Sequence, residues 1–393
     1  MLLFFVLIIF FLLHIQFLFR NLVFGISELY YFDFLLVYPY DESVARSTLM
    51  FSLICTFAFA IGYQIAKKLT LKKYCDRGSS PYVPSKSVLR LTNFFSLIPI
   101  LYMLILGIVT GFDYGSMVSI RETSTFIFEL RMIFLVMLSY ILLNSGVKLF
   151  FNAPNFRTTR SLLYVYIVLS LLFQARSLAF EVLSIIAFSH IVGGKDKIRL
   201  LYVIGVLISL VIPNVIVMGR LGTPDSPEKL LSGLFSFEYS ILINKFLSAA
   251  VEKDSLLDTY SFIPTLQLIV PSPIRNLFGL VVEKSDYYSE MSDLANISSG
   301  GFSLLAEMYS NFGYYSSAVF LVMGAIMGHL NSKAMRLGRV SILTAIAPLL
   351  YASFILSFRN DLGVFLKYSV QLFFVGCLLY CFIPKNGKNA YRF

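Results

Sequence analysis

Most of this chain consists of apolar stretches about as long as a lipid bilayer is thick, separated by short polar segments. The stretches cover residues 2–19, 47–66, 91–110, 126–147, 161–174, 177–193, 200–219, 304–330, 341–357 and 362–383. A helix needs roughly 20 apolar residues to cross a hydrocarbon core about 30 Å thick. Hydrophobic residues make up 58% of the chain and charged residues 14%, against roughly 45–50% and about 25% in soluble domains. We therefore expect an all-α integral membrane protein with about ten transmembrane helices.

Three parts of the chain leave this span count open. The stretches 161–174 and 177–193 are separated only by Gln174-Ala-Arg176, so they are either two short helices or one long broken segment. Residues 21–40 are rich in aromatic residues and carry two acids, which favours an interfacial segment over an eleventh span. The first stretch begins without basic residues and lacks a small-residue cleavage site, so we interpret it as an uncleaved span.

The basic residues predict how the chain is oriented in the membrane. With ten spans and a cytoplasmic N-terminus, the inner segments hold 19 Lys and Arg and two acids, whereas the short outer loops hold five Arg. This asymmetry follows the positive-inside rule, and it accounts for the net charge of +10 without nucleic acid as a partner. We expect one polytopic domain over residues 1–393 in a bacterial inner membrane, with both termini cytoplasmic and a large periplasmic loop over 220–301.

The large loop is polar in composition but contains amphipathic sequence. It holds ten acids and six bases, and residues 228–250 have apolar side chains at helical spacing. We expect short amphipathic helices there, lying near the membrane surface.

Arginines mark the outer ends of the predicted spans: Arg176, Arg220, Arg275 and Arg359. The guanidinium group offers a fixed fork of donors that matches phosphate oxygens, and positive charge outside runs against the topological preference. The set therefore favours a phosphate or pyrophosphate site. The alternative for each arginine is contact with lipid headgroups or a local ion pair, such as Arg359 with Asp361.

Charged residues also occur inside the predicted spans. Glu129 and Arg131 lie in the fourth span and Lys367 lies in the tenth. Such charges usually face a bundle interior or a cavity, although near a span end they can also extend to the interface. Glu181, near the outer end of the sixth span, can pair with a cation or act as an acid or base.

The segment 298–314, SSGGFSLLAEMYSNFGY, carries the most informative spacing in the chain. Glu307 and Asn311 are four residues apart and so point to one face of a helix, with Ser303 one turn earlier. A carboxylate at the outer boundary of the membrane can bind a sugar hydroxyl or remove its proton. It can equally be an interfacial carboxylate paired with a nearby arginine.

Other chemistries lack the residues they need. The histidines are His14, His190 and His329, and none lies in the large loop, so a base there must be Asp, Glu or another group. The four cysteines show no zinc or disulfide spacing, and no nucleotide-binding glycine loop is present. We expect no metal and no cofactor.

Several segments together resemble the bacterial O-antigen polymerases of the Wzy type, also called oligosaccharide repeat-unit polymerases. The resemblance covers most of the chain as architecture and about 40 residues as motif. Its motifs are Gln174-Ala-Arg176-Ser177, Pro271-Ser-Pro273-Ile-Arg275, GGFSLLAEMYSNFGYYS at 300–316, and Arg-Asn-Asp at 359–361.

The resemblance implies a membrane-embedded glycosyltransferase with a GT-C-like helical fold. Such enzymes join oligosaccharide units carried on undecaprenyl pyrophosphate at the periplasmic face, in the biosynthesis of lipopolysaccharide and related polysaccharides. Carried over by position, Glu307, Arg176 and Arg275 become candidate catalytic residues. Candidate substrate-binding residues are Arg220, Arg359, Asn311, Glu181 and Tyr309. Membrane lipids are expected partners, with a chain-length regulator as a further candidate.

Two other functions fit the same layout. O-antigen ligases share the donor, but they are expected to use a histidine in the large outer loop, and this loop has none. A repeat-unit flippase or other transporter typically has evenly spaced spans with short loops and often internal repeats. Here an 80-residue loop interrupts the chain, which favours a polymerase.

Overall fold

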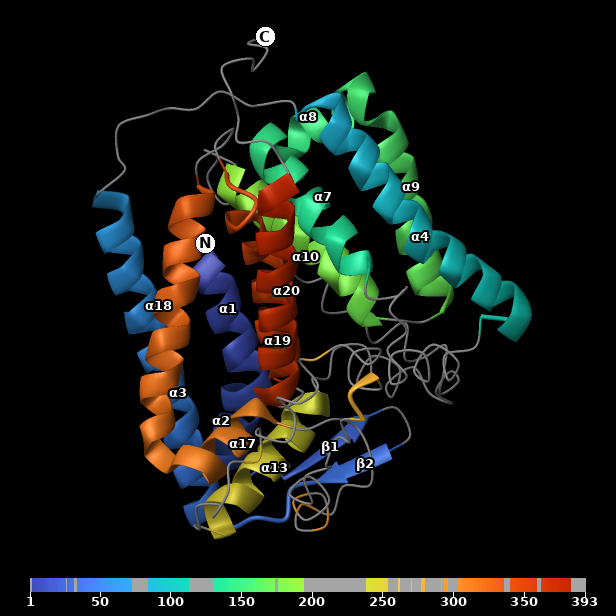
Figure 1. Ribbon diagram of the computed structural model, residues 1–393. Helices are drawn as coiled ribbons and strands as arrows, with labels where there is room; N and C mark the ends of the chain where they lie inside the picture. Colours follow the sequence, from blue (N-terminus) through green and yellow to red (C-terminus); the bar gives the residue numbers. More distant parts are fainter. Residues whose placement is uncertain are drawn as a thin grey trace.

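The computed structural model describes residues 2–25, 27–31, 34–72, 84–112, 130–173, 176–193, 238–253, 303–335, 340–358 and 362–382, with residues 261, 270, 277–279, 291, 293 and 295. Apart from one two-stranded hairpin, the elements of this part of the chain are helices, as predicted (Figure 1). The predicted seventh span at 200–219 and most of the large loop lie outside the described residues. The elements are α1 (Leu2–Phe10), η1 (Phe11–Ile15), α2 (Gln16–Phe24), β1 (Glu28–Tyr31), β2 (Phe34–Val37), α3 (Glu42–Lys72), α4 (Lys86–Thr110), α7 (Arg131–Ser145), α8 (Val147–Asn152), η2 (Pro154–Phe156), α9 (Arg157–Leu172), α10 (Arg176–Gly193), α13 (Glu238–Lys253), α17 (Leu304–Phe312), η4 (Gly313–Tyr315), α18 (Ser316–Ala334), η5 (Thr344–Ile346), α19 (Ala347–Ser357) and α20 (Leu362–Phe382).

In the part of the chain that the structure describes, four helical segments are long and apolar enough to cross a membrane: Leu2–Phe24, Glu42–Thr70, Lys86–Thr110 and Leu304–Ala334. Four shorter apolar helices accompany them at Arg131–Ser145, Leu178–Val192, Thr344–Ser357 and Phe365–Cys381. Large apolar side chains cover the outer surface of α4, including Phe94, Leu101, Ile105, Ile108 and Val109. A surface of this kind is stable in lipid rather than in water. These are the features of an integral membrane protein.

The helices run between two ends of the bundle (Figure 1). At one end, here called the loop face, α2 ends and α3, α10 and α20 begin, and the hairpin, α13 and α17 lie there. At the opposite face α3, α10 and α20 end. The alternatives for residues 161–193 are resolved, because α9 ends at Leu172 and α10 begins at Arg176 and runs back in the opposite direction.

Between the first span and α3 the chain forms the hairpin rather than a further helix. The first span ends at Gly25, whose φ of +66° is a left-handed conformation that glycine adopts without strain. Strands β1 and β2 then pair antiparallel, with Glu28 opposite Val37 and Tyr31 opposite Phe34. We predicted an interfacial segment over residues 21–40. In the structure this segment contains the end of the first span and the hairpin, both at the loop face.

Helix α7 forms the centre of the bundle and is buried on all sides. Its 15 residues span only about 22 Å at 1.5 Å per residue, less than the thickness of a bilayer core. Its polar groups bond to the loop before α19: Ser139 Oγ donates to the carbonyl of Ala345 (2.6 Å), and Asn144 exchanges two hydrogen bonds with the backbone of Val340. Burial by other helices, rather than lipid contact, thus stabilises this short helix.

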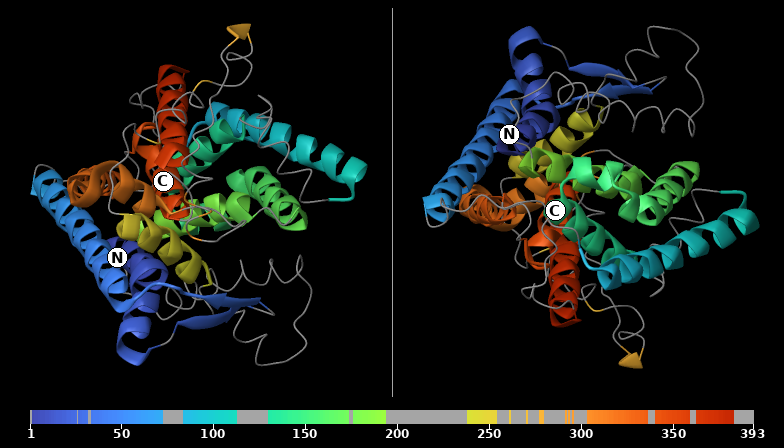
Figure 2. Two further views of the ribbon diagram at one scale, coloured as in Figure 1. Left: turned by 90° about the horizontal axis from the view of Figure 1, so that it is seen from below. Right: turned by 90° about the horizontal axis from the view of Figure 1, so that it is seen from above.

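Helices α3 and α18 pack so closely that glycine is required in their contact. A Cβ on Gly62, Gly324 or Gly328 would overlap backbone atoms of the facing helix, including the carbonyl groups of Phe59 and Tyr63. Glycines four residues apart are typical of tightly packed membrane helices, where close approach replaces the hydrophobic driving force. Figure 2 shows this pair on the opposite side of the bundle from α4 and α9.

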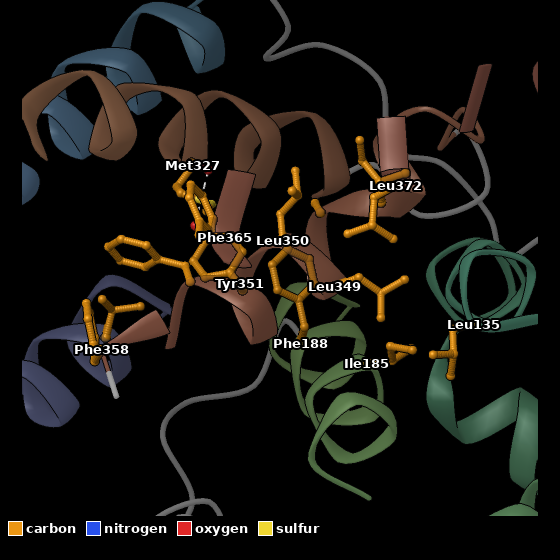
Figure 3. Close-up of a cluster of buried hydrophobic side chains, with 14 of the residues drawn as sticks. Leu135, Ile185, Phe188, Met327, Leu349, Leu350, Tyr351, Phe358, Phe365 and Leu372 are labelled. Carbon is orange, nitrogen blue, oxygen red and sulfur yellow. Dashed lines mark hydrogen bonds between the residues drawn. The ribbon is translucent and has the colours of Figure 1, made fainter. Parts of the chain in front are cut away.

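Apolar side chains from five helices meet around α19 (Figure 3). Tyr351 of α19 lies with its ring centroid 5.1 Å from that of Phe188 in α10, and Phe354 stacks on Phe59 of α3 at 5.0 Å. The cluster also contains Leu135, Ile185, Met327, Leu349, Leu350, Phe358, Phe365 and Leu372. Helix α19 thereby joins the α3–α18 pair to α7, α10 and α20.

One predicted helix is broken, and one amphipathic segment is described only in part. The apolar run 304–330 is divided into α17 and α18 by a 3₁₀ turn that begins at Gly313, whose φ is +53°. Of the predicted amphipathic segment 228–250, the described part forms α13, Glu238–Lys253. It lies at the loop face, where it packs against α17, α3 and the first span.

Candidate functional site

Glu307 and Asn311 lie on one face of α17, as their spacing predicts, and both contact Ser261 of the large loop. Ser261 Oγ donates to Glu307 Oε1 (2.7 Å), Asn311 Nδ2 donates to Ser261 Oγ (2.8 Å), and Ser261 N–H donates to Asn311 Oδ1 (2.9 Å). The helix begins at Ser303, whose hydroxyl accepts from the N–H of Ala306 and caps it. The spacing and the cap together orient the carboxylate toward the loop.

The second oxygen of the carboxylate binds the start of α20. Glu307 Oε2 accepts from the backbone N–H of Leu362, the first residue of that helix. A helix N-terminus carries positive partial charge and stabilises an anion there. Glu307, Asn311, Ser261 and the Leu362 N–H are called the Glu307 cluster below. All three side chains are buried, and Glu307 is 0% exposed.

A second buried cluster consists of Arg131, Glu181 and Tyr368. The guanidinium of Arg131, at the start of α7, lies 3.2 Å from the carboxylate of Glu181 in α10 and donates to the hydroxyl of Tyr368 in α20 (2.9 Å). The side chains of Arg131 and Glu181 are 1% and 7% exposed. Burial removes water from both charges, and their attraction for each other offsets that loss. Removal of either partner therefore leaves a buried charge without compensation.

The contacts of Arg131 show which of two predicted positions its charge takes, the bundle interior or the membrane interface. Arg131 faces the bundle interior and does not extend to the membrane surface. Glu181 pairs with a cation, which is one of the two roles that the sequence left open. Lys367 is half-buried near Tyr368, and Glu129 lies outside the described residues.

The two clusters share helix α20. Leu362 binds Glu307 and Tyr368 binds Arg131, and six residues separate them, or about 9 Å along a helix axis. Both clusters therefore lie near the loop-face end of α20. Helix α20 therefore links the Glu307 cluster to the ion pair of Arg131 and Glu181.

The other predicted site residues are only partly placed. Arg176 is the first residue of α10, at the loop face and five residues before Glu181. Arg220, Arg275 and Arg359 lie outside the described residues, and Arg359 directly follows Phe358 in the sequence. Tyr309 points away from Asn311 toward α3, where its ring packs on Phe51 at 4.9 Å.

Sequence reasoning missed two partners. Ser261 is one serine in a long loop, and no spacing connects it to Glu307, 46 residues later. Tyr368 is 237 residues from Arg131, and only the fold brings them together. A tyrosine inside an apolar span was the one available signal, since a buried hydroxyl in lipid needs a polar partner.

Metal-binding groups and known relatives give no further guidance. Among the described residues, no group of three or more His, Cys, Asp and Glu side chains is placed to hold a metal ion. No family model, curated protein or solved structure matches this chain. Its function is therefore inferred from the two clusters and their place in the fold.

Proposed function

We propose that this chain is a polysaccharide polymerase of the O-antigen type, a glycosyltransferase that joins repeat units carried on undecaprenyl pyrophosphate. The observation that carries the proposal is the Glu307 cluster. It is a buried carboxylate at the loop face, held by a loop serine and by the first N–H of a membrane helix. A carboxylate at the boundary between the loop and the membrane helices is suited to accept the proton of a substrate hydroxyl.

The distribution of basic residues favours a periplasmic loop face. The described Lys and Arg at the opposite face are Lys67, Lys68, Lys72, Lys86, Arg90, Lys148, Arg157, Arg160 and Lys333. Those of the loop-face half are Arg20, Arg46, Arg131, Arg176, Lys245, Lys253 and Lys367, of which Arg46 pairs with Glu42 and Arg131 with Glu181. Positive charge is retained on the cytoplasmic side during insertion, so this pattern favours cytoplasmic termini in an inner membrane.

The proposed reaction follows from these groups. Glu307 accepts the proton of an acceptor sugar hydroxyl, and the oxygen attacks the anomeric carbon of the donor glycan. The bond from that carbon to the pyrophosphate oxygen breaks, and the lipid pyrophosphate leaves with the bonding electrons. Arg176, Arg275, Arg220 and Arg359 are proposed to stabilise the negative charge on the leaving group.

Glu181 is then a positioning residue rather than a direct contact for substrate. It neutralises Arg131 within the bundle, and Tyr368 links the pair to the helix whose first N–H binds Glu307. Asn311 holds Ser261 against Glu307 through two hydrogen bonds. Movement of the loop thus changes the surroundings of the proposed base.

The test is a glycan ladder from a deletion strain that carries plasmid copies of the gene. Glu307→Gln and Arg176→Ala should leave a single repeat unit on the lipid core, with the protein still present in the membrane. Glu42→Gln and Arg46→Ala are matched controls, because these residues form an exposed ion pair at the same face, and they should give full-length polymer. Normal ladders from both Glu307→Gln and Arg176→Ala would contradict the proposal.

The same gel tests a transporter, the second candidate. An ion pair in a membrane interior, such as Arg131–Glu181, is typical of transport pathways as well as of catalytic sites. A strain that lacks a flippase shows no repeat unit on the core. A strain that lacks a ligase accumulates polymer on the carrier lipid. Either pattern in the deletion strain would replace the polymerase assignment.

A further inference from the structure

His14 lies in the middle of the first span and has no hydrogen-bond partner among the described residues. Its side chain is 0% exposed, and both ring nitrogens are buried. The ring instead contacts two aromatic rings, those of Phe10 at 5.5 Å and Phe358 at 5.6 Å between centroids. A buried polar group without a partner destabilises a protein, and in lipid no water compensates for it. A histidine at this position therefore has a use other than stability.

The backbone around His14 is also unusual. Residues Phe11–Ile15 form a π-helical turn within an otherwise α-helical span. Such turns are rare, interrupt the regular hydrogen bonds and occur frequently at functional sites. Here a residue of the large loop bonds to the backbone of this turn: Asn244 Nδ2 of α13 donates to the carbonyl oxygen of Leu13 (3.2 Å).

Asn244 supplies a second polar atom without a partner. Its Nδ2 is bound to Leu13 and, at 2.6 Å, to the carbonyl of Ser240, but its Oδ1 is buried with no hydrogen bond in the described part of the chain. Asn244 itself is 0% exposed. Asn244 thus bonds to the residue that precedes His14 in the first span, and both side chains carry buried polar atoms that no described residue binds.

The chemistry of these atoms indicates their ligand. A neutral imidazole has one N–H donor and one acceptor nitrogen, and the amide oxygen is an acceptor. A hydroxyl group both donates and accepts, so it complements this set, and the surrounding rings of Phe10 and Phe358 give the mostly apolar lining usual in ligand sites. Phe358 lies four residues before Leu362, whose N–H binds Glu307.

We propose that His14 and Asn244 form a subsite for a sugar hydroxyl of the lipid-linked glycan. The subsite rests on the proposed function, since the glycan is its ligand. It is closed in this structure, and Asn244 holds α13 against the first span through Leu13. Entry of the sugar separates α13 from the span, and the hydroxyl then donates to Asn244 Oδ1 while its oxygen accepts from the His14 ring N–H.

The test uses purified full-length protein in detergent and two probes. One is glycan-bearing undecaprenyl pyrophosphate extracted from a polymerase-deficient strain, and the other is undecaprenyl pyrophosphate without glycan. The chain has three histidines, so their ring signals in a histidine-labelled sample are assigned by single substitutions. The glycan-bearing lipid should shift the His14 signal, the bare lipid should not, and His14→Phe should weaken glycan-lipid binding at least tenfold.

Stability separates a binding role from a structural one. His14→Phe removes an unsatisfied polar group, so its melting temperature should equal or exceed that of the wild type while binding falls. His14→Gln keeps a donor and an acceptor and should lose only a few-fold in binding. If His14→Phe does not accumulate, His14→Gln is the variant whose binding is measured instead. His190→Gln, at an exposed position near the far end of α10, is the control and should bind normally.

The outcomes distinguish the two proposals. If the wild type binds the glycan lipid but His14→Phe binds it equally well, or the His14 signal does not move, the subsite is wrong and the polymerase assignment stands. Equal shifts with both lipids would also overturn a sugar subsite. If the wild type binds neither lipid, the proposed function fails and the subsite fails with it.

Discussion

The interior of the bundle and the layer at the loop face hold buried carboxylates in different ways. In the interior, Glu181 faces a full positive charge on Arg131, and both groups come from membrane helices. At the loop face, Glu307 accepts hydrogen bonds from a loop hydroxyl and a helix N-terminus, so its described partners are dipoles. The ion pair ties two membrane helices together, whereas the hydrogen bonds of Glu307 tie the large loop to the start of α20. The comparison predicts a role in stability for the first cluster and, under the proposed function, a role in chemistry for the second.

The largest expected effect comes from breaking the ion pair. Glu181→Ala leaves the buried charge of Arg131 without its carboxylate and should cost about 3–5 kcal/mol of stability, enough to lower the amount of folded protein. Arg131→Met should be similarly damaging alone. The two changes together remove both charges, and the double variant should unfold at a higher temperature than either single one. Thermal unfolding in detergent measures all three.

Glu252→Gln is the control for this experiment, because Glu252 is an exposed acid on α13 and its removal should leave the melting temperature unchanged within error. A double variant no more stable than Glu181→Ala would mean that the pair is not the source of the loss. The ion pair of Arg131 and Glu181 would then not be what stabilises the interior of the bundle.

A smaller effect is expected from Asn311, which joins α17 to the loop. Asn311→Leu removes two hydrogen bonds to Ser261 and leaves its buried N–H without an acceptor, at a cost of about 1–3 kcal/mol. We expect the protein to accumulate, the polymer to shorten, and a protease to cut the loop near residue 261 faster than in the wild type. Ser261→Ala keeps the backbone bond to Asn311 and should show a milder form of each change.

The result for Asn311→Leu distinguishes two roles of Asn311, which are to hold the loop against Glu307 and to contact the substrate. If Asn311→Leu gives normal polymer while the loop is cut faster, then the loop does not position Glu307. If it abolishes polymer without faster cleavage, Asn311 contacts the substrate directly, as its sequence position first suggested.

The sequence predicted the parts of this molecule that depend on local pattern. Apolar runs of bilayer length became helices, and the spacing of Glu307 and Asn311 placed both on one face. Both results follow from helix periodicity, which acts within a few residues. The break at Gly313 was missed because a glycine in a membrane span is common and does not by itself end a helix.

Partners distant in the sequence were beyond prediction. Arg131 and Glu181 were each recognised as charges inside spans, but nothing in the chain states that they meet, since 50 residues separate them. The π-helical turn at His14 likewise packs against α13, more than 200 residues later. Such contacts depend on the order in which spans are arranged, which hydrophobic periodicity does not encode.

The smallest expected effect concerns the hairpin, which the loop-face layer holds through Tyr38 and Tyr40. Tyr38 Oη and Ser248 Oγ of α13 lie 2.5 Å apart in a hydrogen bond, whereas the buried hydroxyl of Tyr40 has no partner among the described residues. Burial, with a contribution from the charge of Glu252, raises the pKa of Tyr40 to about 12. Burial also raises the pKa of Tyr38 well above its usual range.

Raised phenol pKa values predict the direction of an alkaline transition. The stabilising contribution of the neutral phenols is complete below pH 10, their ordinary pKa, and is lost as the pH rises toward 12. Tyr38→Phe should cost about 0.5–1.5 kcal/mol at pH 8 through its lost bond, while Tyr40→Phe should cost nothing there and should reduce the alkaline loss. Unfolding followed from pH 8 to pH 12, with phenolate absorbance in parallel, measures both. An equal loss from the two variants at pH 8 would show that Tyr40 has a partner in the loop, and that the hairpin is held by two hydroxyls instead of one.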